Sequence, residues 1–429
     1  MENSVKNLIQ FIDHSPSCFH VIENAKKQFL EHGFIQLEEK EHWNLEEGKS
    51  YFVERNGSSM IAFHLPKKDF QGFHIVASHS DSPTYRIKEQ PEMSVEKHYT
   101  KLNIERYGGM IPETWFDRPL SVAGRIIIEE NGQIKDQLVN IDRDLMIIPN
   151  LAIHMSRSSN ESKQLNPQKD LLPLCGGNLT KDAFEEMIAK ESGVEKEDIL
   201  SYDLFLYNRM RGTTLGINEE FVAAPKLDDL ECVYSSIEGM LNAKLSKDYV
   251  TVCAVFDNEE VGSGTKQGAG STFFPEVLKR ISYLCGKNEE EYYMAVADSF
   301  MLSADNAHAV HPNYQDKTDP TNRPYINEGI VLKYNASQKY TTDANSAALV
   351  KYLCKKEKIK CQVFFNRSDM LGGSTLGNIL TGQVSIKAAD IGLPQLSMHS
   401  TYETAGCKDL DDMITLMESF YELGKEVQI

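Results

Sequence analysis

Two adjacent glutamates, Glu259 and Glu260, follow a short apolar run at residues 252–256 that is typical of a buried strand. Neighbouring side chains of a strand point to opposite faces, so both carboxylates can reach one place only where the chain leaves the sheet. There, one carboxylate can bind a metal ion while the other moves a proton. The alternative is a solvated acidic turn, the more common role of such a sequence taken alone.

Other residues of metal-binding types occupy similar positions. His79 and Asp81 end the apolar strand predicted from residue 73, and their spacing places both on one face, where Asp81 could orient a metal-bound imidazole. Asp228 precedes a helix predicted over 230–243, as a helix cap or as a bridging metal ligand. Near the C-terminus, a strand predicted at 395–400 closes on His399. The candidate ligands that share this placement are His79, Asp228, Glu260, Asp305 and His399.

These five candidate ligands offer nitrogen and oxygen atoms but no thiolate, which suits zinc, cobalt or manganese. Two histidines and three carboxylates can hold a pair of divalent ions if one aspartate is shared. Such a pair activates a water molecule and polarises the carbonyl that the water attacks. Glu259 is not needed as a ligand, so it is free to act as the general base.

Bulk composition limits the class of protein. A chain of 429 residues predicts two or three domains, and 45 basic against 63 acidic residues give a net charge of −18. This charge repels nucleic acid and anionic membranes, so neither is expected as a partner, and an acidic substrate would need a local cation. The eight scattered cysteines form no CxxC pair and favour reduced thiols in a cytoplasmic protein. We find no signal peptide and no membrane-spanning run.

The order of predicted elements indicates one interrupted domain. Amphipathic helices are predicted at 4–13, 17–32 and 409–425. Between 85 and 222 the pattern changes to short strands with many turns, and residues of metal-binding types resume beyond it. We therefore expect a catalytic domain formed by 1–84 and 223–429, interrupted by an inserted domain at 85–222.

Five motifs resemble the M18 family of metalloaminopeptidases, the aspartyl aminopeptidase group, and the resemblance covers essentially the whole chain. The motifs are HSDSP at 79–83, KLDD at 226–229, FDNEEVGS at 256–263, SADNAHAVHPNY at 303–314 and MHS at 398–400. The resemblance implies an α/β catalytic domain of the three-layer zinc-peptidase type with a mixed sheet, and a β-rich dimerisation domain inserted into it. It also implies two metal ions bridged by Asp228, with Asp81 supporting a ligand and Glu259 as general base. Dimers would assemble into a tetrahedral dodecamer.

The resemblance assigns roles to further residues. His154 taken alone is more commonly a core histidine, but it matches a family histidine that enters the neighbouring subunit's site to stabilise the oxyanion. A role as metal ligand is the weaker alternative. Lys333, otherwise a surface lysine, matches a residue that pairs with an acidic substrate side chain. The substrate pocket is expected to include Lys333, Tyr340, Asp369 and Met370.

Three places depart from the family pattern: Asn150 replaces a common histidine, Asp229 a common asparagine, and MLGGST at 370–375 a different loop. The loop bears on substrate preference.

The motifs and candidate ligands together predict a cytoplasmic aminopeptidase that removes N-terminal residues, Asp or Glu, from peptides. The alternatives are another metal-dependent amidohydrolase, such as a deacylase, and a non-catalytic shell-forming protein.

Overall fold

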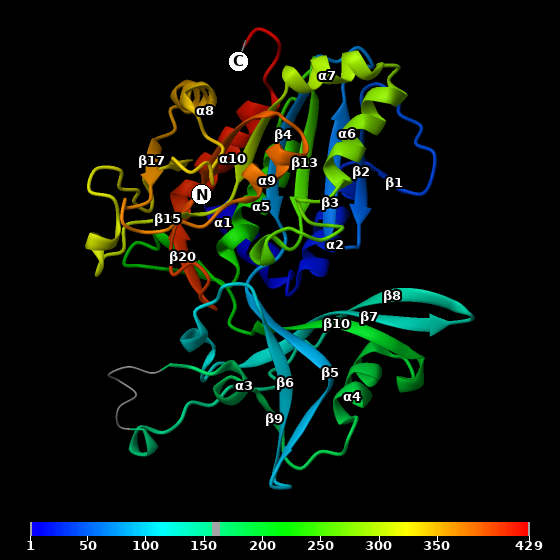
Figure 1. Cartoon of the computed structure of the whole chain (residues 1–429), viewed down its shortest axis with the longest axis vertical. Helices are drawn as coiled ribbons and strands as arrows, with labels where there is room; N and C mark the ends of the chain where they lie inside the picture. Colours follow the sequence, from blue (N-terminus) through cyan, green and yellow to red (C-terminus); the bar gives the residue numbers. More distant parts are fainter. Residues whose placement is uncertain (1, 157–163, 428–429) are drawn as a thin grey trace.

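The structure is a computed structural model that describes residues 2–156 and 164–427. Within these residues the strands form three sheets (Figure 1). The largest has nine strands, in the order β1 (Ile35–Leu37), β2 (Lys49–Arg55), β3 (Ser59–Leu65), β13 (Val250–Phe256), β4 (Phe73–His79), β14 (Phe300–Ala304), β18 (Lys387–Gly392), β16 (Ile330–Tyr334) and β17 (Cys361–Phe365). Its centre, from β13 to β18, is parallel, whereas β3 and β16 pair antiparallel to this centre.

Helices cover both faces of the nine-stranded sheet, because its central strands are apolar on both sides. Val76 of β4 packs into one core, and its neighbours Ile75 and Ala77 pack into the other. The first core is closed by α1 (Glu2–Asp13), α2 (Cys18–Glu31), α5 (Leu227–Asn242), α8 (Ala344–Glu357) and α10 (Cys407–Tyr421). The second is closed by α6 (Phe273–Leu284), α7 (Glu289–Ala297) and α9 (Leu376–Gln383). The predicted three-layer α/β fold with a mixed sheet is confirmed.

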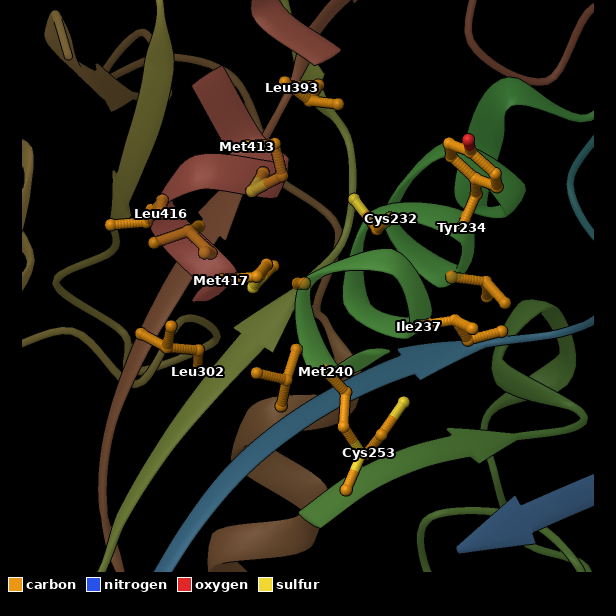
Figure 2. Packing of buried hydrophobic residues seen from close by; sticks show 14 of the residues in the cluster. Cys232, Tyr234, Ile237, Met240, Cys253, Leu302, Leu393, Met413, Leu416 and Met417 are labelled. Carbon is orange, nitrogen blue, oxygen red and sulfur yellow. The ribbon is translucent and has the colours of Figure 1, made fainter. Parts of the chain in front are cut away.

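Figure 2 shows how α5 is held in the first core. Cys232, Ile237 and Met240 of this helix lie among residues of the sheet and of α10, including Cys253, Leu302, Met413 and Met417. All of these side chains are at most 1% exposed. The packing therefore fixes the N-terminal turn of α5, which carries Asp228, against the sheet.

A six-stranded antiparallel sheet lies below the nine-stranded sheet in the view of Figure 1, together with α3 (Pro167–Asp170) and α4 (Ala183–Ser192). Its strands are β8 (Gln133–Asn140), β7 (Leu120–Glu130), β10 (Ile199–Asn208), β5 (Thr84–Val95), β6 (Tyr99–Tyr107) and β9 (Leu174–Gly176). It has its own apolar core around Trp115 and Ile126. The boundaries at 84/85 and 222/223 and the role in dimerisation stay predictions.

The third sheet is small and was not predicted. Its strands are β11 (Thr213–Leu215), β12 (Phe221–Ala224), β20 (Glu403–Gly406), β19 (Pro394–Leu396) and β15 (Ala307–His308). The turn between β19 and β20 carries His399. This sheet therefore delivers a C-terminal histidine to the edge of the nine-stranded sheet where β4 ends.

Candidate functional site

Three parallel strands end side by side at the centre of the large sheet. β4 ends at His79, which is paired in register with Phe256 at the end of β13. On the other side of β4, β14 ends at Ala304, directly before Asp305. Since the carboxyl ends of parallel strands meet at one edge, His79, Glu259, Glu260 and Asp305 share that edge.

His399 reaches the same place from a turn. We predicted a strand through residue 400, but β19 ends at Leu396, and His399 has a left-handed backbone with φ of 66°. The turn brings its imidazole Nε2 to 3.3 Å from Asp228 Oδ2 and 3.3 Å from Glu260 Oε1. The prediction of the element was wrong at this point, although the placement of His399 beside other candidate ligands was expected.

Both histidines present the same ring nitrogen to the cluster. Nδ1 of His79 donates to the carbonyl oxygen of Asp81 at 3.0 Å, and Nδ1 of His399 donates to the carbonyl of Gly109. A carbonyl oxygen only accepts, so Nδ1 carries the proton in each ring and Nε2 faces the carboxylates. Nε2 of His79 lies 3.5 Å from Asp228 Oδ1. This is the arrangement that a metal-binding imidazole requires.

The ligand atoms fall into overlapping groups that could each hold a cation. Within the described residues, one group joins His79, Asp228 and Asp229, and another joins Asp228, Glu260 and His399. A third joins His79, Glu259 and Glu260. In each group the atoms lie within 4.8 Å of one another. The fold thus brings together four of the five candidate ligands and the candidate base, with Asp228 in two groups.

Asp305 lies at the side of this cluster, where it contacts Lys333. The carboxylate Oδ1 of Asp305 is 3.4 Å from Lys333 Nζ, which also donates to the carbonyl oxygens of Asp305 at 2.6 Å and Asn306 at 3.3 Å. Lys333 is 2% exposed, so it is not a surface lysine. Its ammonium lies 5.3 Å from the centre of the Tyr340 ring, so these two predicted pocket residues are adjacent.

The remaining predicted site residues lie apart from this cluster. Asp369 and Met370 are on an exposed loop, where Asp369 pairs with Arg367 at 2.8 Å. His154 is exposed, in a 3-10 turn at Ile153–Met155, and belongs to none of the potential metal groups of the described chain. The structure therefore does not bring His154 to the ligands of its own chain.

The site concentrates negative charge away from solvent. Burial raises the pKa of Glu260 to about 7, and burial together with neighbouring carboxylates raises the pKa of Glu259 well above its usual range. Burial lowers the pKa of His399, but Asp228 and Glu260 raise it more strongly, to about 11. Buried charges of one sign are costly unless cations neutralise them.

A divalent cation fits this donor set. Asp228 Oδ1 and Glu260 Oε1 are buried and have no hydrogen-bond partner among the described atoms. Such unpartnered carboxylate oxygens, beside two imidazole nitrogens that are held by their opposite ring atoms, match the ligands of zinc and similar metals. The potential metal groups contain His79, Asp228, Glu260 and His399 of the predicted ligands, but not Asp305, and the assignment of the five ligands stays a prediction.

Asp81 supports the site differently from the prediction. Its carbonyl oxygen orients the His79 ring, whereas its carboxylate, 3.5 Å from the ring, accepts the backbone N–H groups of Glu259 and Glu260, each at 3.1 Å. Tyr107 of the six-stranded sheet also donates to it at 2.7 Å. We missed Tyr107, since a hydroxyl that bonds across two sheets leaves no local pattern in the sequence.

A cavity of about 280 Å³ adjoins the site between the two larger sheets. Asp81, Asp228 and Glu403 line it from one side, and Phe205 and Tyr207 line it from the six-stranded sheet. The predicted substrate residues Lys333, Tyr340, Asp369 and Met370 do not line it.

None of the helices in the described ranges is long and apolar enough to cross a membrane.

Comparison with known proteins identifies the family. Residues 11–421 match the family model of aminopeptidase I zinc metalloproteases (M18). A probable M18 family aminopeptidase 2 of Clostridium acetobutylicum is 46% identical over 97% of this chain and 98% of its own length. Among solved structures, Ape4 in complex with Nbr1 matches with a TM-score of 0.95 at 36% identity, over 98% of this chain and 85% of that one. The structure of the S. cerevesiae mApe1 dodecamer matches with a TM-score of 0.85 at 26% identity, over 98% of this chain and 97% of that one. A family model and a relative that both cover nearly the whole chain show that the protein belongs to the M18 family of zinc metalloaminopeptidases.

Proposed function

We propose that this aminopeptidase uses two divalent metal ions and removes N-terminal aspartate or glutamate from peptides. The observation that carries the dinuclear site is the position of Asp228. This residue belongs to one potential metal group with His79 and to another with His399 and Glu260. A carboxylate with one oxygen facing each histidine suits a bridging ligand.

In this proposal the residues of the site have two roles, as ligands of the metal ions and as the general base. Bound divalent ions would supply Lewis acidity for the scissile carbonyl and lower the pKa of an attacking water. His79 and Asp305 would hold one ion, His399 and Glu260 the other, and Asp228 both. Glu259, whose backbone N–H is held by Asp81, would take the proton from the water and return it to the leaving amine.

The preference for acidic substrates rests on Lys333. Its ammonium is buried beside Asp305 and the ring of Tyr340. Burial lowers its pKa, but Asp305 and the neighbouring Tyr340, Asp390 and Cys232 together raise the pKa above its ordinary value, so the ammonium stays charged. An ammonium has three N–H donors, and two of them reach backbone carbonyls of residues 305 and 306. The remaining donor is proposed to bind a substrate carboxylate in place of its 3.4 Å contact with Asp305 Oδ1.

We also propose a homo-oligomer, a tetrahedral dodecamer built from dimers. The likeness to the mApe1 dodecamer supports it. The segment around His154 adds support, because Leu151, Ile153 and Met155 expose 52%, 46% and 76% of their surfaces. A partner subunit covering these apolar residues would carry His154 with them to its neighbour's site.

The test is a panel of chromogenic amides on metal-stripped protein reloaded with zinc, cobalt or manganese. We expect hydrolysis of aspartyl and glutamyl amides that requires a metal, and none of the N-acetylated forms. Release of acetate from the N-acetylated forms, with the chromogenic amide left intact, would indicate a deacylase. Absence of both metal binding and hydrolysis would indicate a non-catalytic shell protein.

The same panel tests the acidic preference with Lys333→Met, which keeps the apolar stem and removes the charge. Because Lys333 contacts the candidate ligand Asp305, we expect the substitution to lower kcat/KM to some extent on every substrate. We expect kcat/KM to fall at least about tenfold more on aspartyl than on leucyl amides, the value of one charge-assisted hydrogen bond. An equal loss on both would assign Lys333 to Asp305 alone.

A further inference from the structure

Glu403, to which the sequence analysis gave no role, connects two of the candidate ligands through their backbones. It is 2% exposed, at the start of β20. Its Oε1 accepts the backbone N–H of His399 at 2.6 Å, and its Oε2 accepts the backbone N–H of Asp228 at 3.0 Å. One carboxylate thus holds two segments that lie far apart in the chain.

Both N–H groups need such an acceptor. Asp228 has φ of −81° and ψ of 107°, which are not helical, and it stands in the first turn of α5, where N–H groups have no intrahelical partner. His399 lies in a turn beyond the end of β19, so it has no strand partner either. Buried backbone donors without acceptors are costly, and a carboxylate forms stronger bonds with them than a neutral group.

The same device recurs around the cluster. Asp229 Oδ2 accepts the backbone N–H of His79 at 3.1 Å, and the Asp81 carboxylate accepts those of Glu259 and Glu260. Glu403 differs from these two because it holds one ligand from α5 and one from the small sheet, whereas Asp229 and Asp81 each hold residues of one segment. Glu403 therefore ties Asp228 directly to His399, in addition to the packing of α5 and the hydrogen bond from His399 to Gly109.

We propose that Glu403 is a positioning residue that sets the separation of Asp228 and His399 and thereby the affinity for the metal ion they share. The inference rests on the proposed dinuclear site. Glu403 acts through the backbone of the ligands, so its removal leaves all five ligand side chains in the protein. The effect expected is that of a group that supports ligands, about 10–100-fold in metal affinity.

The test is Glu403→Gln, measured by competition between the protein and a chromophoric chelator for Zn²⁺. A glutamine offers one acceptor oxygen, and its amide N–H₂ then faces the second backbone N–H. We expect one zinc ion per chain to bind about 10–100-fold more weakly, while the other keeps its affinity. Reloading with Co²⁺ should show a changed visible spectrum, and excess zinc should restore part of kcat. Glu403→Asp serves the same test if the glutamine variant does not fold by circular dichroism.

Asp409→Asn is the matched control. Asp409 is 1% exposed, and its carboxylate likewise accepts two backbone N–H groups, those of Asn327 at 2.6 Å and Gly329 at 2.8 Å. None of these residues is a candidate ligand. We therefore expect Asp409→Asn to lower Tm about as much as Glu403→Gln does, but to leave the zinc affinity unchanged. Equal zinc affinities of Glu403→Gln and wild type, or an equal loss in Asp409→Asn, would overturn the role of Glu403 alone. Binding of fewer than two zinc ions by the wild type would overturn the dinuclear proposal and this inference with it.

Discussion

Glu259 is the residue whose role is easiest to isolate. Its N–H is bound to Asp81, and its carboxylate belongs to a potential metal group with His79 and Glu260 but is not required as a ligand. Glu259→Gln removes the ability to accept a proton while keeping shape. We expect at least about a 100-fold loss of kcat with two zinc ions still bound, measured by amide hydrolysis and metal analysis. Activity close to that of wild type would exclude Glu259 as the base.

The candidate ligands could be predicted because strand ends leave a pattern. An apolar run followed by His, Glu or Asp marked His79, Glu260 and Asp305, and the structure places all three at one edge of the sheet. Glu403 and Tyr107 could not be found in this way, because the hydrogen bonds of Glu403 to Asp228 and of Tyr107 to Asp81 join segments that are distant in the chain. For Lys333, residue type suggested a charge partner, but only the fold revealed that Asp305 is beside it.

At the scale of the element, β4 carries a histidine that should make the fold sensitive to acid. His74 is 2% exposed, and its ring stacks on Tyr249 with centroids 4.0 Å apart. Burial lowers its pKa to about 3. The unfolded chain binds a proton below about pH 6.5 and the folded one does not, so stability is lost as pH falls from 6.5 towards 3, by about 1.4 kcal/mol per pH unit.

We therefore expect His74→Phe, which keeps an aromatic ring against Tyr249, to reduce the fall in Tm between pH 7.5 and 5.5. Thermal unfolding of the metal-free protein measures this, with His32→Phe at an exposed position as control. If Tm falls by the same amount between pH 7.5 and 5.5 in the His74 variant and in the wild type, other groups cause the acid sensitivity.

Helices with a strong hydrophobic period were predicted well from the sequence, whereas short strands were not. The helices predicted at 4–13, 17–32 and 409–425 are observed as Glu2–Asp13, Cys18–Glu31 and Cys407–Tyr421. The small sheet was missed because β15 and β19 have two and three residues, too few to show alternation. The order of the strands in the large sheet could not be predicted either, because β4 lies between β13 and β14, which follow it much later in the chain.

At the scale of the whole molecule, His154 connects subunits in our proposal. We expect His154→Ala to lower kcat about 100-fold by removing a group that stabilises the oxyanion. Mixing it with Glu259→Gln should raise activity above that of either variant alone, because a mixed dimer contains one site with both residues intact. The measurement is hydrolysis after dissociation and reassociation of the two variants. No recovery would place His154 outside the neighbouring site, and pairs of identical variants treated alike are the control.

The order of these residues along the polypeptide has a consequence for biosynthesis. The nine-stranded sheet is complete only when β16, β17 and β18 have joined it, and the turn with His399 and the strand with Glu403 come later still. At a translation rate of about 5–20 residues per second, His79 leaves the ribosome roughly 15–60 s before His399. In our proposal the peptidase centre needs His399, so we expect it to stay inert throughout that interval, and a half-made chain would not cleave the nascent peptides around it.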